Sequence, residues 1–231
     1  MQIKPFALRA VAAALLIGGL LQSGVAAPAL AESAMPSARA AKSMAAVVPI
    51  FSQSVVFTLP GGWKPAFEND GKDSYMLEFV PQGQTVEAWK EMITVQGLRN
   101  LAKNPQFAPL ALIENIAGGL KKICGDELIF QSLGDTKVGV YDAHAAILGC
   151  ARVEVEAFGA KTGQGELAYY LVIKGTNDMY VVQRAIRGAA FAKADAPISP
   201  GSAEAFMRAM QPIKVCERSG SQVDCAAQAS R

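Results

Sequence analysis

Four cysteines and one histidine are the residues whose types and spacing could support chemistry in this chain. Thiols act as metal ligands, redox pairs or disulfide cross-links, and their spacing separates these roles. No two cysteines form a C-x-x-C pair and His144 is alone, so the spacing indicates neither a zinc site nor a thiol-redox motif. The favoured interpretation is two disulfides, Cys216 with Cys225 because they are close in sequence, and Cys124 with Cys150 by elimination. A thiol-redox protein remains an alternative.

His144 lies in the segment DAHAAIL and is the natural candidate for a general base. Asp142 lies two residues earlier, on the same face of the segment if it is a strand. The pair could serve a hydrolase that uses Asp142 and His144 with a serine or water that the sequence does not identify. No G-x-S-x-G motif accompanies the histidine, and a lone histidine on a strand is more often structural. No catalytic residue is therefore assigned.

Two aromatic and two basic side chains are candidates for ligand binding. Trp63 follows a Gly-Gly turn and should be more exposed than Trp89, which we expect in the core. Arg184 and Arg187 end an apolar segment and could pair with a ligand carboxylate, or with an acid of the sheet such as Glu78. A purely structural role for the arginines is the competing interpretation. The glycine-rich GAKTGQGE lacks the phosphate-loop pattern, is expected to be a hairpin turn, and predicts no cofactor.

The N-terminal residues predict export. Lys4 and Arg9 precede an apolar run that is short for a membrane span, and Ala29-Leu30-Ala31 fits a cleavage signal. We therefore expect a cleaved signal peptide at 1–31, a flexible leader at 32–46 and a single globular domain at 47–231 with a C-terminal disulfide loop. The expected location is the periplasm or the exterior, where thiols tend to pair.

The charge balance excludes two classes of partner. The chain has 22 basic and 20 acidic residues, and removing Lys4 and Arg9 with the signal leaves 20 of each. A neutral chain without a basic block lacks the electrostatic footprint of nucleic-acid or anionic-lipid binding. We expect no stable membrane insertion after cleavage, and an unknown protein or small ligand as partner.

The elements that position these residues follow from hydrophobic periodicity. The pattern predicts strands near 55–59 and 74–83. It predicts a helix with one apolar stripe over residues 85–104, which Asn104-Pro105 ends. A second helix is expected near 109–123 and a last one near 202–210. Between these two helices the period changes to that of strands, including a pair around Gly175 to Asn177.

The fold class predicted from this order is α+β. LAYYLVIK, from Leu167 to Lys174, is apolar on both faces, so its strand should be covered on both sides. With the three predicted helices as the available covers, we expect an α/β/α sandwich: a mainly antiparallel sheet with helices on both faces.

The order of elements resembles that of PsbP-like α/β/α domains and of small secreted bacterial proteins of that kind. It is carried by a strand ending LPGGW, a second ending FVPQG, a Trp-bearing helix, a long meander and a terminal helix, over most of residues 50–213. The resemblance implies an accessory or binding role more often than catalysis, although the cysteine loop after Cys216 is not a feature we associate with that fold. The predicted function is a non-catalytic exported domain that binds a protein or a small ligand.

Overall fold

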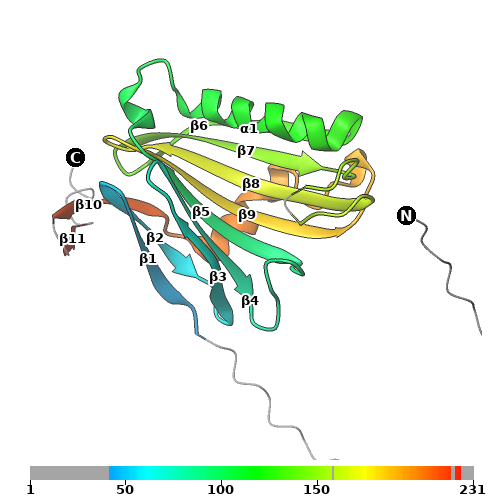
Figure 1. The fold of residues 1–231 in the computed structure, drawn as a ribbon, viewed down its shortest axis with the longest axis horizontal. Helices are drawn as coiled ribbons and strands as arrows, with labels where there is room; N and C mark the ends of the chain where they lie inside the picture. The colour runs from blue at the N-terminus through cyan, green and yellow to red at the C-terminus, as the bar shows by residue number, and fades with distance from the viewer. Residues whose placement is uncertain (1–41, 158, 220–221, 225–231) are drawn as a thin grey trace, which may run out of the picture. The chain divides into compact units, whose positions relative to one another are not determined.

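The computed structural model describes residues 42–157, 159–219 and 222–224, all within the unit Arg39–Arg231. Two antiparallel sheets make up most of this unit (Figure 1). The larger has seven strands in the order β3-β4-β5-β9-β8-β7-β6, and the smaller has four in the order β1-β2-β10-β11. None of the helices in the described part of the chain is both long and apolar enough to cross a membrane.

The strands of the large sheet are β3 (Trp63–Asp70), β4 (Ser74–Pro81), β5 (Glu91–Leu98), β6 (Leu128–Val138), β7 (Tyr141–Cys150), β8 (Gln164–Lys174) and β9 (Met179–Ala189). Those of the small sheet are β1 (Met44–Ile50), β2 (Gln53–Leu59), β10 (Lys214–Ser219) and β11 (Gln222–Asp224). The helices are α1 (Pro109–Cys124) and α2 (Pro200–Met207), with short 3-10 turns η1 (Leu101–Lys103), η2 (Gly125–Glu127), η3 (Lys193–Asp195) and η4 (Arg208–Met210).

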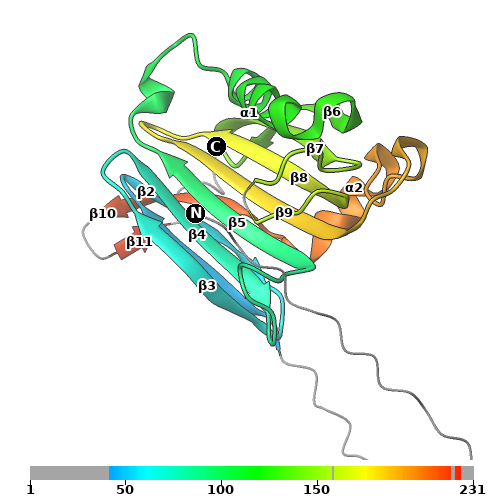
Figure 2. The same ribbon diagram turned by 45° about the vertical axis from the view of Figure 1, so that its right-hand side comes forward.

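Helix α1 covers part of one face of the large sheet. Pro109 occupies the first turn, where its missing N–H costs nothing, and apolar residues recur at spacings of three and four from Leu112 to Leu120. Gly125 ends the helix with a φ of 54°, a conformation that glycine adopts without steric penalty. The helix lies over β6, β7 and β8. On the same face of the sheet, β9, β5 and β4 extend beyond the helix (Figures 1 and 2).

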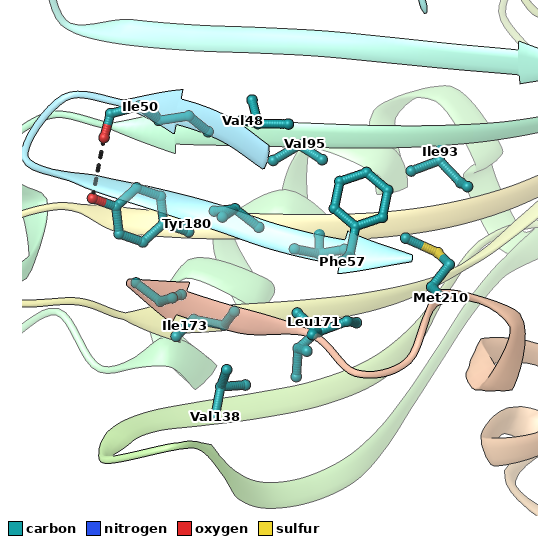
Figure 3. Packing of buried hydrophobic residues seen from close by; sticks show 14 of the residues in the cluster. Val48, Ile50, Phe57, Ile93, Val95, Val138, Leu171, Ile173, Tyr180 and Met210 are labelled. Atoms are coloured by element: carbon teal, nitrogen blue, oxygen red, sulfur yellow. Dashed lines mark hydrogen bonds between the residues drawn. The ribbon is translucent and has the colours of Figure 1, made fainter. Parts of the chain in front are cut away.

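The opposite face of the large sheet is covered by the small sheet and by α2 with η4. Phe57 of β2 and Ile50 of β1 are buried against Ile93, Leu171 and Tyr180 of the large sheet (Figure 3). The Tyr180 hydroxyl donates to the backbone carbonyl of Ile50 at 3.4 Å. Met207 and Met210 continue this core beneath α2 and η4. The large sheet thus lies between α1 on one face and the small sheet with α2 on the other.

The prediction that helices cover both faces is therefore not confirmed, because the small sheet shares the face opposite α1 with α2. The mainly antiparallel sheet, the helix near 109–123 and the helix near 202–210 are confirmed. The helix predicted over 85–104 is wrong, because residues 91–98 form strand β5. Its residues from Met92 to Val95 are buried consecutively, because Ile93 and Val95 pack in the core beneath the small sheet and Met92 in the core on the α1 side, so burial along this part of the strand does not alternate. The small sheet takes the place expected for a helical layer.

Gly97 shows how closely the two layers meet at β5. A Cβ at this position would overlap Cγ2 of Ile50 in β1. The absence of a side chain at Gly97 therefore allows the small sheet to approach the large one. Gly97 lies in a strand and not in the predicted helix. Strand β1 begins at Met44, inside the stretch 32–46 that we expected to be a flexible leader.

Candidate functional site

The cysteines of the described residues are cross-links. Cys124, at the end of α1, and Cys150, at the end of β7, form a disulfide with their Cα atoms 5.1 Å apart. This confirms the pairing predicted by elimination. Cys216 is buried and disulfide-bonded, whereas Cys225 lies outside the described residues. Among the cysteines that the structure describes, no free thiol is left for redox chemistry.

His144 and Asp142 are not partners. The Asp142 carboxylate is exposed and pairs with Lys137 Nζ at 2.6 Å, so its predicted role beside His144 is wrong. His144 is only 3% exposed and hydrogen-bonds two side chains of β6 instead. Its Nδ1 lies 2.6 Å from Asp135 Oδ1, and its Nε2 lies 2.8 Å from Ser132 Oγ. The cross-strand pairing of β6 with β7, shifted by a bulge between Ser132 and Gly134, brings these residues together.

This arrangement has the contacts of a serine with a histidine base. With the proton on Nδ1, His144 donates to Asp135, and its Nε2 accepts from the Ser132 hydroxyl. Its surroundings differ from those of a hydrolase, because the Asp135 side chain is 91% exposed and its charge is screened by water. The cavity of about 640 Å³ beside β6 is lined by Ser132 and Asp135. Its lining also includes Ala145 and Tyr169, which lie on the opposite face of the sheet from His144, so the histidine itself is not part of the lining.

Arg184 and Trp63 are the other predicted site residues. Both pack on the face of the large sheet that the small sheet and α2 cover. Arg184 Nη2 pairs with Glu91 Oε2 at 2.8 Å, and Nη1 donates to the Phe206 carbonyl. The guanidinium carbon also lies 4.4 Å from the centre of the Phe206 ring, so Arg184 ties α2 to the sheet. Trp63 is half-buried at the start of β3 and packs against the core. The structure brings none of His144, Asp142, Arg184 and Trp63 together in one site.

A groove lies instead where α1 stops covering its face of the sheet. It has a volume of about 420 Å³. Its floor is formed by strands β4, β5, β8 and β9, and its walls by α1 and the loop between β4 and β5. The lining residues are Met76, Glu78, Val86, Trp89, Met92, Thr94, Gln96, Asn115, Ile116, Gly119, Leu120, Glu166, Tyr170, Gln183 and Arg187. We call this the α1 groove.

Arg187 anchors one end of the α1 groove. It is 8% exposed, and its Nε and Nη2 lie 2.8 and 2.7 Å from Glu166 Oε2 on the neighbouring strand. Its guanidinium carbon lies 3.9 Å from the centre of the Trp89 ring. Burial raises the pKa of the Glu166 carboxyl, and the guanidinium charge acts in the opposite direction. The Arg187 charge is thus already neutralised within the protein.

A row of polar side chains crosses the floor of the α1 groove. Glu78 of β4 is directly opposite Thr94 of β5, which is directly opposite Gln183 of β9. Within the described part of the chain these three side chains form no hydrogen bond with another residue. Burial raises the pKa of the Glu78 carboxyl, with Arg187 acting in the opposite direction. The polar atoms of these side chains are not among the buried unpartnered atoms of the described residues, so they are open to the groove and available to a bound molecule.

Sequence reasoning named Glu78 as a possible partner of Arg184 and Arg187, but Arg187 pairs with Glu166 and Arg184 with Glu91. It missed Thr94 and Gln183. The available signal was that Thr94 and Gln96 are polar at alternate positions of an otherwise apolar segment. Interpreting this segment as a helix removed that signal.

Comparisons with known proteins found distant matches among solved structures. No protein-family model and no curated protein matches the chain. A mutant of the protein Mog1 and the Saccharomyces cerevisiae Ran-binding protein Mog1p each match with a TM-score of 0.43 and 11% identity, over 72% of this chain and 90% of theirs. LpqN of Mycobacterium tuberculosis, involved in cell envelope biogenesis, matches with a TM-score of 0.32 and 11% identity, over 75% of this chain and 91% of its own. Similarities this low assign neither a function nor a partner to this chain.

Proposed function

We propose that this chain is an exported, non-catalytic binding domain and that the α1 groove holds a small, largely apolar ligand. The observation that carries the proposal is the row Glu78, Thr94 and Gln183, whose hydrogen-bonding groups have no partner among the described residues and lie beneath apolar walls. Ligand sites are typically cavities of roughly 300–1,000 Å³ with apolar linings and a few placed polar groups. The α1 groove, at about 420 Å³, has this size and composition.

A disulfide and the N-terminal sequence support the proposal of export. The disulfide between Cys124 and Cys150 fits an oxidising compartment, and a signal peptide at 1–31 would deliver the chain there. The resemblance to PsbP-like domains, which we retain as a proposal, also implies a binding or accessory role.

Two glycines of α1 provide a direct test. Gly119 lines the groove and Gly118 does not, and a Cβ at either position would meet open space. Gly119→Gln should place a long side chain in the groove, while Gly118→Gln is the matched control. Glutamine is a better helix former than glycine by roughly 0.5–1 kcal/mol, so both variants should fold.

The measurement is a fluorescence titration with Nile red, a neutral apolar dye. We expect Gly119→Gln to weaken dye binding at least about tenfold, a loss of roughly 1.4 kcal/mol, and Gly118→Gln to bind as the wild type does. Equal binding by the two variants would contradict the assignment of the groove as the ligand site.

Hydrolysis at Ser132 is a second candidate function, favoured by the two hydrogen bonds of His144. A fluorophosphonate probe distinguishes it, because an activated serine would attack phosphorus and expel fluoride while its proton passes to His144. A binding domain predicts no labelling. Mass spectrometry that finds Ser132 labelled in the wild type, but not in His144→Ala, would establish the hydrolase instead.

A further inference from the structure

We propose that the α1 groove selects an amine: a small apolar molecule with one protonated nitrogen that sits beside Glu78. The inference rests on the proposed function and names the class of ligand. It follows from the charges that line the groove and from the hydrogen-bond acceptors on its floor.

Among the residues that the structure describes, the charges of the lining leave one acid without a partner. Its charged side chains are Glu78, Glu166 and Arg187. Arg187 binds Glu166 through Nε and Nη2 and stacks on Trp89, so its charge is already compensated within the protein. Arg187 and Glu166 cancel, and Glu78 leaves a formal charge of minus one. A cation is therefore attracted to the groove and an anion is repelled.

The floor matches the donors of an ammonium group. Ammonium carries three N–H donors and no acceptor. Glu78 and Thr94 are opposite each other on adjacent strands, which lie about 4.8 Å apart. A nitrogen between them can donate to the carboxylate and to the hydroxyl oxygen. Gln183, one strand further, offers its amide oxygen to a second polar group of the ligand.

The walls match an apolar body. Met76 and Met92 lie on the two strands that carry Glu78 and Thr94, and Ile116 and Leu120 face them from α1. Methionine side chains adapt to ligands of varied shape. Because Glu78 is half-buried among such residues, water solvates its carboxylate poorly, and a cation there gains more than it would at an open surface.

Three eight-carbon probes test the inference by isothermal titration calorimetry with the whole protein: octylamine, octanol and octanoate, each below its micelle concentration. A charge-assisted hydrogen bond in a partly buried site should make octylamine bind about tenfold to a hundredfold more tightly than octanol. Octanoate should bind more weakly than octanol. Glu78→Gln should bring octylamine to the affinity of octanol. Glu114→Gln, which removes an exposed acid of α1 outside the lining, should change neither.

The outcomes separate the two proposals. If octanol binds, but octylamine binds no better or Glu78→Gln has no effect, the amine inference is overturned and apolar binding in the groove stands. Octanoate binding as tightly as octylamine would also overturn it. If none of the three probes binds, both the inference and the proposed function fail.

Discussion

Replacing Cys124 and Cys150 by alanine should destabilise the protein by an amount that the chain geometry sets. The disulfide joins residues 26 apart in sequence and anchors the end of α1 to β7. In the chain-entropy treatment, releasing a loop of this length increases the freedom of the unfolded chain and costs about 3.5 kcal/mol of stability at 25 °C. The same change frees one end of the helix that walls the α1 groove, so Nile red binding should weaken as well.

Guanidinium unfolding, followed by tryptophan fluorescence, measures the change. Trp89 is buried beside Arg187 and should report the transition. We expect the double variant to lose about 2–4 kcal/mol in the free energy of unfolding. Dithiothreitol should destabilise the wild type by more than it destabilises the double variant, which lacks this cross-link. A loss below about 1 kcal/mol would refute the view that the disulfide restrains the unfolded chain.

Three further predictions concern stability and are checked by chemical denaturation. Asp178→Ala removes a buried carboxylate that accepts hydrogen bonds from two backbone N–H groups, and should lower the free energy of unfolding by at least about 1–3 kcal/mol. Asp142→Ala removes only an exposed ion pair and should lower it by less than about 1 kcal/mol. Equal losses in the two variants would contradict this. Gly97→Ala should cost about 1–3 kcal/mol by overpacking the two sheets, while Gly118→Ala in α1 should stabilise by up to about 1 kcal/mol; a neutral Gly97→Ala would argue against the close approach. Burial raises the folded-state pKa of Glu78, so the folded chain holds the proton of this carboxyl more tightly than the unfolded chain does. The stability that this proton contributes is fully present below the ordinary pKa of about 4.5 and is lost as the pH rises through the raised pKa. Relative to wild type, Glu78→Gln should therefore gain stability between about pH 4.5 and 7, and a difference independent of pH would contradict the burial of this acid.

The sequence predicted the parts of the fold whose patterns are local. Helix α1 follows from an apolar stripe between Pro109 and Gly125, and the two-sided burial of β8 follows from its continuous apolar run. Strand β5 was misread because Trp89, Ile93 and Gly97 happen to fall at helical spacing, and this spacing was preferred to the alternation of Thr94 and Gln96. The face opposite α1 is covered by a sheet because β10 pairs with β2, which lies far away in sequence.

The candidate site was harder to predict, because it is defined by a surface left uncovered. Local patterns give no information on which strands α1 covers, so they cannot show that a groove is left over β4, β5 and β9 beside it. The partners of His144 depend on a bulge in β6 that shifts Asp135 into register with it. Arg187 was recognised as able to pair with an acid, yet whether it pairs with a ligand or with Glu166 is decided only by the alignment of β8 with β9.

The most direct test of the α1 groove is a two-dimensional NMR titration of the protein with octylamine. The chain has two tryptophans, Trp89 in the lining and Trp63 outside it, and each gives its own indole N–H signal. Ligand binding in the groove predicts that the signal of Trp89 and the amides of Thr94 and Gln183 shift, while the signal of Trp63 stays in place. Shifts confined to Ser132 and its neighbours, or equal shifts of both indoles, would contradict it.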